Sequence, residues 1–296
     1  MGRRREQVFG WCLVAPCALF VGVFAFYPIA YSVYLSLHRI VLTLPQLGQP
    51  FVGLANYREL LRDPIALRSL GNTLAFVALS TALELALGLG IALVIHRRFP
   101  GRGAVRAAVL VPWAIPTVVS SQLWRFLCND QYGLINYLAF GVETARYRAW
   151  LADPLWAFAA IVVADVWKTS SFAGLLLLAG LQTIPDELYE AARVDGAGVW
   201  QRFRRVTLPL LRPALLVALL FRTMDAFRVF DLVFVMTQGG PADATNVLQF
   251  YGYKKIFTEG LMGYGTAVSV LVFVVSLGVS VAYLAAVGRW RREGVG

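Results

Sequence analysis

Long apolar runs, separated by polar segments, organise the whole sequence of 296 residues. A helix that crosses the hydrocarbon core of a bilayer needs about 20 mostly apolar residues, and six runs reach that length. The strands of a membrane β-barrel would instead show short alternating segments. The pattern predicts an all-α integral membrane protein with a single domain over residues 1–296 and six transmembrane helices, at about residues 9–36, 70–95, 107–127, 155–181, 213–236 and 262–288.

The first apolar run resembles a signal peptide at its start, because three arginines precede it. Its length argues against that interpretation. Residues 8–37 contain no Asp, Glu, Lys or Arg, whereas the apolar part of a signal peptide spans about 7–15 residues. We therefore expect this run to be an uncleaved first span.

Composition agrees with a membrane protein and excludes other classes. Hydrophobic residues make up 58% of the chain and charged residues 15%, whereas a soluble domain carries about 25% charged residues. Intrinsic disorder is excluded, because it requires low hydrophobicity. Most of the 27 Lys and Arg residues lie at the two ends and in segments 96–106 and 182–212. The positive-inside rule then places both termini in the cytoplasm, and the net charge of +10 needs no nucleic-acid partner.

Metal and disulfide chemistry finds no support in the sequence. The three cysteines lie in apolar surroundings, and their spacing fits neither a disulfide framework nor a zinc site. The two histidines are far apart and have no cluster of Cys, Asp or Glu beside them. We expect no metal site in this chain.

The polar segment between the fourth and fifth spans, residues 182–212, contains a helical pattern. Asp186 and Glu187 favour a helix start, since acidic side chains interact well with the N-terminal end of a helix. Asp195-Gly196 then predicts a tight turn, after which Trp200 and Phe203 continue a helical spacing. The residues predict two short helices joined by a glycine bend beneath the bilayer. An amphipathic segment that only anchors the spans would show the same composition.

The motif in this segment resembles the EAA loop of bacterial ATP-binding-cassette (ABC) importer permeases. The matching residues are Glu190-Ala191-Ala192, Asp195-Gly196-Ala197, Phe203, Leu208-Pro209 and Pro213. Other short motifs are similar to the carbohydrate branch of this family, in particular to the first permease subunit of maltose/trehalose-type importers: 53–57, Pro112, 165–169, 221–227 and 237–241. The resemblance covers nearly the whole chain. It implies the type I ABC importer permease fold and a bacterial or archaeal plasma (inner) membrane location.

The resemblance also implies a coupling mechanism and a set of partners. An EAA loop docks on an ATPase subunit, and the residues expected to make that contact are Glu190, Ala191, Ala192, Asp195 and Gly196. The implied partners are a second permease subunit, an ATPase dimer, an extracytoplasmic substrate-binding protein, membrane lipid and a disaccharide. Outer loops 38–68, 125–153 and 238–259 are expected to receive the binding protein.

ATP hydrolysis is not expected in this chain. A phosphate-binding P-loop needs the pattern G-x-x-x-x-G-K-[ST], and no lysine of the sequence stands in it. We therefore expect a non-catalytic transport subunit that has no cofactor of its own. ATP and magnesium would be bound by the partner ATPase.

Charged residues inside the predicted spans indicate a polar path through the membrane, because a charge in the bilayer is costly and usually functional. In relatives of this family, the sugar lies against segments that correspond to the surroundings of these charges. The charges and the resemblance together predict a substrate site where spans three, four and five meet: Asp165, Lys168, Thr169, Phe172, Arg222 and Asp225. Salt bridges between helices, without sugar contact, are the alternative. For Arg228, Asp231 and Glu84 the choice between the two stays open.

A different class of protein also fits the charged spans. An ion- or proton-coupled secondary sugar transporter could use Asp165, Lys168 and Asp225 as a relay, but it would need neither the EAA loop nor an ATPase. The sequence does not determine which sugar is carried.

Overall fold

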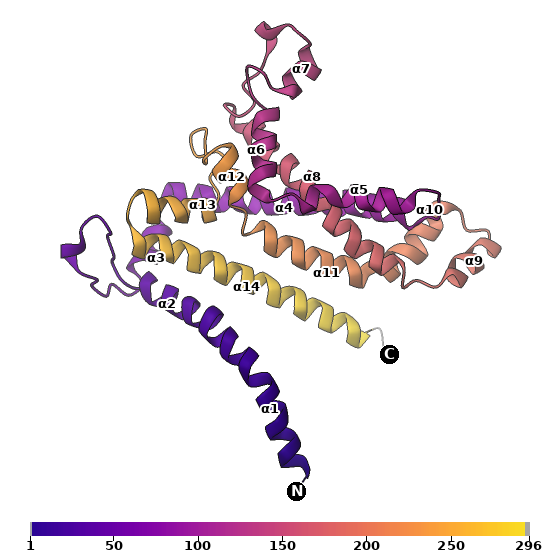
Figure 1. Ribbon diagram of the computed structural model, residues 1–296, viewed down its shortest axis with the longest axis horizontal. Helices are drawn as coiled ribbons and strands as arrows, with labels where there is room; N and C mark the ends of the chain where they lie inside the picture. Colours follow the sequence, from indigo (N-terminus) through magenta and orange to yellow (C-terminus); the bar gives the residue numbers. More distant parts are fainter. Residues whose placement is uncertain (1, 294–296) are drawn as a thin grey trace. The chain divides into compact units, whose positions relative to one another are not determined.

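The computed structural model describes residues 2–293 of the chain, and over this range it forms helices and no extended sheet (Figure 1). The helices have the following bounds: α1 Gly2–Val21, α2 Tyr27–Ser36, α3 Ala55–Leu60, α4 Pro64–His96, α5 Arg102–Ala114, α6 Thr117–Leu127, α7 Leu134–Phe140, α8 Pro154–Leu181, α9 Asp186–Val194, α10 Val199–Arg202, α11 Leu208–Ala226, α12 Asp231–Met236, α13 Leu248–Tyr253 and α14 Met262–Glu293. Three π-helical turns, Gly22–Phe26, Phe203–Thr207 and Lys254–Thr258, continue neighbouring helices.

The chain forms two compact units. The first consists of Met1–Ala66 and Tyr251–Phe273, and the second of Leu67–Phe250 and Val274–Gly296. In the first unit, α1 and α2 join through a π-helical turn into one long helix (Figure 1). Its apolar window is not buried against the rest of the chain. The structure does not describe the side chains of Arg3, Arg4 and Arg5, which precede this window.

Within the described residues, five helical stretches are long and apolar enough to cross a membrane. Four of them match the predicted spans closely: Phe9–Ser36, Pro64–His96, Pro154–Leu181 and Met262–Ala285. The first, second, fourth and sixth predicted spans therefore coincide with helices of sufficient length and apolar composition. The side of the membrane on which the termini lie stays a prediction.

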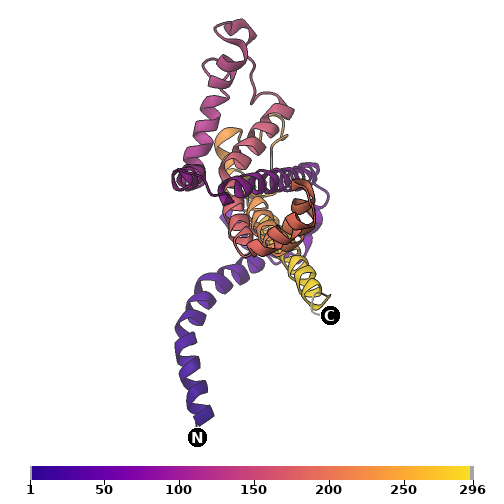
Figure 2. The ribbon, with the colours of Figure 1, turned by 90° about the vertical axis from the view of Figure 1, so that its right-hand side faces the viewer.

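The third predicted span, residues 107–127, is not one straight helix. It consists of the consecutive helices α5 and α6, which meet at 90° (Figure 2). The break follows from proline chemistry. Ile115 precedes Pro116 and is extended, with φ −72° and ψ 132°, and Pro116 has no amide hydrogen to continue the helix.

The fifth predicted span, residues 213–236, is displaced toward its N-terminal side. The long helical stretch runs from Val199 to Ala226, and α12 is a separate helix that begins at Asp231. Our prediction of the outer end was wrong, because α11 ends at Ala226 and the chain turns through residues 227–230, which include Arg228, before α12 begins. The inner end begins early because the turn Phe203–Thr207 joins α10 to α11 without a break.

Close packing of α8 with α4 and α11 forms the apolar core of the second unit. Small residues make this approach possible. A Cβ atom added to Gly88 of α4 would lie 2.9 Å from the Cβ of Ala173 on α8. A Cβ atom added to Gly180 of α8 would likewise clash with the Cβ of Ala214 on α11. Large buried side chains such as Leu177 and Leu211 fill the remaining space. Helix α8 is therefore the central element on which the candidate site is built.

Candidate functional site

A cavity of about 120 Å³ lies where α8, α11 and the start of α6 meet, with the turn into α12 at its rim. Five of the six predicted substrate residues line it: Asp165, Lys168, Thr169, Arg222 and Asp225. Thr117, the first residue of α6, and the charged residues Arg228 and Asp231 also line the cavity. The structure thus brings together residues from three predicted spans.

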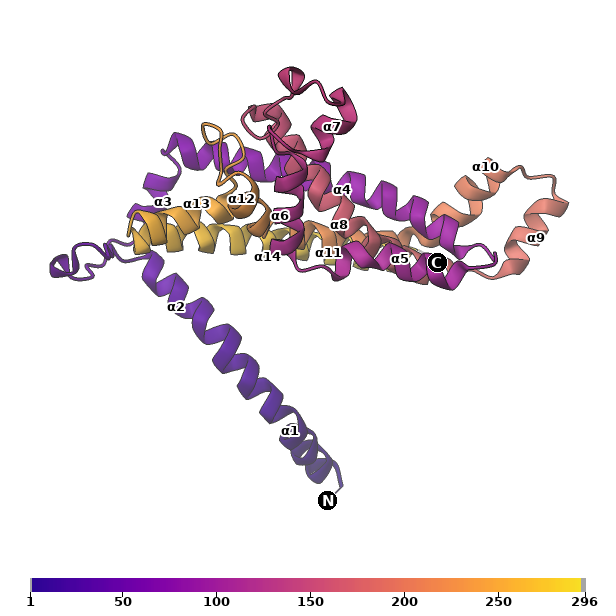
Figure 3. The same ribbon diagram turned by 45° about the horizontal axis from the view of Figure 1, so that its top comes forward.

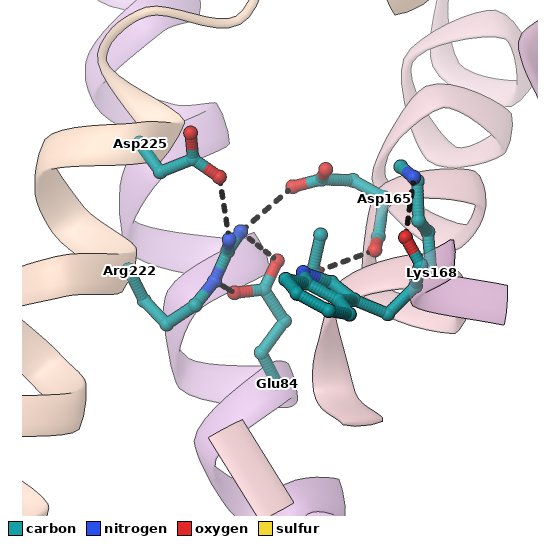
Figure 4. Close-up of polar contacts among 7 residues, drawn as sticks. Glu84, Asp165, Lys168, Arg222 and Asp225 are labelled. Atoms are coloured by element: carbon teal, nitrogen blue, oxygen red, sulfur yellow. Dashed lines mark hydrogen bonds and ion pairs between the residues drawn. The ribbon is translucent and has the colours of Figure 1, made fainter. Parts of the chain in front are cut away.

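Arg222 is the centre of a buried ion-pair cluster (Figure 4). Its Nε and Nη2 atoms donate hydrogen bonds to the two carboxylate oxygens of Glu84, the second at 2.9 Å. Its Nη1 atom donates to Oδ2 of Asp225 at 2.7 Å, and Oδ2 of Asp165 lies 3.5 Å from Nη2. Because every nitrogen of the guanidinium group faces a carboxylate, Arg222 has little capacity left for a sugar in this conformation.

Glu84 is the principal partner of Arg222, and the substrate set predicted from sequence does not include it. Its side chain is 0% exposed, and that of Arg222 is 3% exposed. A lone acidic residue in an apolar span is costly without a partner, and this was the signal available in the sequence. Glu84 therefore acts as a structural partner of Arg222 here. The other charged residues of the predicted spans balance, since three are acidic and three are basic: Asp165, Asp225, Asp231, Lys168, Arg222 and Arg228. Glu84 adds one negative side chain to this set.

Lys168 does not pair with Asp165, although the two residues are three positions apart on α8 and this spacing permits an ion pair. Its ammonium group instead donates hydrogen bonds to the carbonyl oxygen of Trp113, at 3.3 Å, and to that of Ile115. Both carbonyls belong to the broken end of α5. One side of this lysine borders the cavity, while its charge is directed to the backbone of the third span.

Thr169 and Phe172 have different surroundings. The Thr169 hydroxyl lies at the cavity and donates to the carbonyl of Asp165 at 2.6 Å, a helical back-bond. Phe172 does not line the cavity. It stacks on Trp113 of α5, with ring centroids 5.6 Å apart and planes 16° from parallel.

Two carboxylates beside Arg222 remain available to a ligand. Oδ2 of Asp165 is buried and accepts no hydrogen bond, although it lies near Arg222. The side chain of Asp225 is 68% exposed at the opening. An unpartnered buried carboxylate oxygen is costly, and the hydroxyl group of a ligand would satisfy it.

The segment between α8 and α11 forms the two predicted short helices, α9 and α10, which extend past the end of α4 (Figure 3). Gly196 ends α9 in the left-handed conformation, at φ +77°. The amide of Ala197 donates to the carbonyl of Ala192 at 2.8 Å, and that of Gly196 to the carbonyl of Arg193 at 3.0 Å. These two bonds define a Schellman motif, so the predicted glycine bend is confirmed.

The surface of this segment is accessible. Glu190, Ala191, Asp195 and Gly196 are exposed, and Ala192 is half-buried. Large apolar side chains next to them are exposed as well, among them Val194, Val199 and Trp200. Glu190 also borders a cavity of about 800 Å³ between α9, α10 and the end of α4. Within residues 2–293, no group of His, Cys, Asp and Glu is arranged to hold a metal ion.

Comparison with known proteins gives a consistent result. Residues 85–292 match the family described as binding-protein-dependent transport system inner membrane component. The trehalose/maltose transport system permease protein MalF of Thermococcus litoralis is 45% identical over 291 residues, which cover 98% of this chain and 96% of that protein. The trehalose transport system permease protein SugA of Mycobacterium tuberculosis is 42% identical over 272 residues, covering 92% and 86%.

One further relative and one solved structure broaden the comparison. The sulfoquinovosyl glycerol transport system permease protein SmoG of Agrobacterium fabrum is 39% identical over 281 residues, covering 94% of this chain and 90% of that protein. A chain in the crystal structure of a bacterial ABC transporter involved in the import of the acidic polysaccharide alginate superposes with a TM-score of 0.82. It is 23% identical and covers 97% of this chain and 96% of its own length, so it shows a shared fold.

The matched proteins cover nearly the whole length of this chain, and the solved structure shares the fold described above. Such permeases are non-catalytic transport subunits of the inner membrane, which several helices of this chain are long enough to cross. The chain belongs to the family of binding-protein-dependent transport system inner membrane components, as a permease subunit of an ABC transporter.

Proposed function

We propose that this chain is the permease subunit of an ATP-driven importer for a disaccharide of the trehalose or maltose type. The observation that carries the proposal is the cavity in which five predicted residues from separate spans converge, in a chain whose relatives include trehalose and trehalose/maltose permeases. Ligand sites of transporters are commonly found near the middle of the membrane, beside interrupted helices. The break between α5 and α6 lies at this cavity.

The available groups favour a neutral polyhydroxylated ligand. The positive charges of Arg222 and Lys168 are already engaged by carboxylates and by backbone carbonyls. Among the groups left over, Asp165 and Asp225 are hydrogen-bond acceptors, which hydroxyl groups satisfy by donation, while Arg228 and Asp231 add one charge of each sign. A negatively charged sugar would meet an excess of carboxylates at the cavity, so the cavity chemistry disfavours it.

The size of the cavity supports a shared path. Sites for small molecules measure roughly 300–1,000 Å³, and the cavity in this chain is about 120 Å³. A disaccharide would need a further wall, which a second permease subunit would supply. Each subunit would then form about half of the path.

Coupling to ATP hydrolysis would run through α9 and α10. The exposed motif residues Glu190, Ala191, Asp195 and Gly196, and the half-buried Ala192, would contact an ATPase dimer that binds ATP and magnesium. Exposed apolar residues beside them, Val194 and Trp200, are suited to a protein contact rather than to water. An extracytoplasmic binding protein would deliver the sugar to loops 38–68, 125–153 and 238–259, with both termini in the cytoplasm.

Uptake measurements on the assembled complex test the path. Asp165→Asn and Arg222→Gln should each lower the uptake of labelled trehalose or maltose by about tenfold or more, because each removes a charged hydrogen-bonding group at the cavity. Val163→Ala, at an exposed position on the same helix, is the control and should transport normally. Normal uptake in both charge variants, in complexes that assemble, would refute the proposed path.

A matched pair of residues on α9 tests coupling. Glu190→Gln should reduce sugar-dependent ATP hydrolysis and uptake together, whereas Glu187→Gln, equally exposed and outside the motif, should leave both unchanged. Equal behaviour of the two variants would remove the coupling role of Glu190.

An ion- or proton-coupled carrier is the second candidate, because charged side chains line the cavity. It would transport sugar in proteoliposomes that contain this chain alone, driven by an ion gradient. We expect no such transport unless the second permease subunit, the ATPase and ATP are present. Gradient-driven uptake by the isolated chain would establish the carrier instead.

A further inference from the structure

We propose that Lys168 and Phe172 are positioning residues that clamp the broken third span, and that they hold Thr117 at the sugar cavity without themselves binding sugar. The proposal rests on the proposed transport role and assigns two of the predicted substrate residues a different task. The two side chains are one helical turn apart on α8, so they lie on one face of that helix. Both reach α5 beside its break.

The break leaves backbone carbonyls of α5 without their usual donors. In an unbroken helix the amide of Thr117 would bond the carbonyl of Trp113, but the extended Ile115 and the proline at position 116 turn the chain away after Ala114. In a membrane no water replaces missing donors, so each unsatisfied carbonyl is costly. The Lys168 ammonium group donates to the carbonyls of Trp113 and Ile115 on either side of the α5 C-terminus.

The charge of the lysine also suits this position. The C-terminal end of a helix is its negative end, and a cation placed there is stabilising. Lys168 is 8% exposed, and its ammonium group carries several donors that can be shared between two carbonyls. Phe172 adds a stacked contact with the indole of Trp113, at 5.6 Å between centroids. The same stretch of α5 is therefore held by an ionic contact and an apolar contact from one face of α8.

The clamp has a consequence for the cavity. Thr117 starts α6 only two residues after Ile115, and it lines the cavity together with Asp165, Thr169 and Asp225. The carbonyl of Thr117 accepts hydrogen bonds from the Ser120 and Ser121 hydroxyls, at 2.9 and 2.6 Å, which fixes the first turn of α6. Fixing the preceding break thus fixes where this wall of the cavity stands.

The test compares Lys168→Met, which removes the donors at nearly constant volume, with Lys168→Arg, which keeps a charged donor. The measured quantity is the distance between nitroxide labels on α5 and α6, attached at Ala108→Cys and Leu123→Cys, which are exposed positions. The background is a chain whose three cysteines are replaced by alanine, assembled in the full complex. Uptake of trehalose and of maltose is measured in parallel.

We expect a narrow label distance in the parent and in Lys168→Arg, and a broadened or shifted distance in Lys168→Met. Uptake of both sugars should fall in Lys168→Met by about tenfold, the effect of losing a charged hydrogen bond, with the ratio of trehalose to maltose uptake unchanged. Lys168→Arg should recover most of the uptake. If Lys168→Met fails to assemble, Phe172→Leu serves in its place and should broaden the label distance.

An unchanged label distance in Lys168→Met, or in Phe172→Leu where that variant takes its place, would overturn the proposal. An altered ratio of the two sugars at constant distance would also overturn it, because it would assign the lysine to sugar contact. The label distance is independent of transport. If Asp165→Asn and Arg222→Gln both transport normally, the sugar path is wrong, and the distance still decides what Lys168 does.

Discussion

At the scale of single residues, the arrangement around Arg222 shows how a charge is accommodated inside an apolar bundle. A buried ion pair is weak evidence for net stability, but removal of one partner leaves the other uncompensated. Glu84 contributes no exposed surface and binds the guanidinium group through both of its oxygens. Asp225 also binds the group but remains largely exposed. The two carboxylates should therefore differ in their effect on stability.

Neutralising Glu84 should destabilise the complex more than neutralising Asp225. We expect Glu84→Gln to cost on the order of 3 kcal/mol, the lower part of the range for breaking a buried pair. Asp225→Asn should cost clearly less, because water replaces its contact. Thermal unfolding of the purified complex measures both. The double variant Glu84→Gln, Arg222→Gln should lose less than the sum of the single changes, and strict additivity would contradict the pairing.

At the scale of elements, the ends of helices carry much of the specific information. Helix α4 begins after Asp63, whose Oδ1 accepts the amide of Ile65 at 2.8 Å as an N-cap. Oδ2 of the same carboxylate accepts hydrogen bonds from the hydroxyls of Tyr251 and Tyr264, the latter at 3.0 Å. Partial burial opposes ionisation, but these bonds outweigh it and hold the pKa of Asp63 below its ordinary value of 3.8.

This cap should make a pH-dependent contribution to stability. Because the pKa of Asp63 is lowered on folding, its charge stabilises the protein above pH 3.8, and the contribution is lost as the pH falls through the lowered pKa. The melting temperature of the parent should exceed that of Asp63→Asn by a constant amount near neutral pH. The difference should shrink below about pH 4. A difference that stays constant down to the acid limit of the experiment would contradict this.

The turn between α9 and α10 offers a comparison of two glycines. Gly196 has φ +77°, where a side chain is strained, whereas Gly198 has φ −65° and room for a methyl group. Gly196→Ala should cost about 1 kcal/mol locally, while Gly198→Ala should not. We expect reduced ATP-driven uptake only in Gly196→Ala. Uptake assays of the two complexes measure this, and equal uptake would separate the bend from coupling.

At the scale of the whole molecule, the charges inside the spans determine what the path accepts. Arg222 and Lys168 are engaged within the protein, and carboxylates outnumber the remaining cation at the cavity: Asp165, Asp225 and Asp231 line it together with Arg228. Neutral disaccharides should therefore compete for uptake more strongly than disaccharides that carry a carboxylate or a sulfonate. Competition against labelled trehalose measures the order. Effective inhibition by the anionic sugars would contradict this order and would point to Arg228, which also lines the cavity, as the group that binds the anion.

The sequence by itself determined the class of fold and most of the helices. Apolar runs of about 20 residues have few structural solutions in a membrane, because the backbone must satisfy its own hydrogen bonds. The bend at Gly196 was also readable, since its conformation depends on local chemistry. Five of the six candidate residues could be placed at one cavity because charges in apolar spans turn toward each other.

Tertiary structure decided the partners of these charges. The pairing of Glu84 with Arg222 joins residues 138 positions apart, and no local spacing reveals it. Lys168 could bond Asp165 on its own helix, but the orphaned carbonyls of the third span offered better acceptors. The prolines of that span were visible in the sequence, whereas the 90° angle between α5 and α6 was not. The reason is physical: a buried polar group binds whichever partner the packing brings within reach, and that depends on the assembled helices.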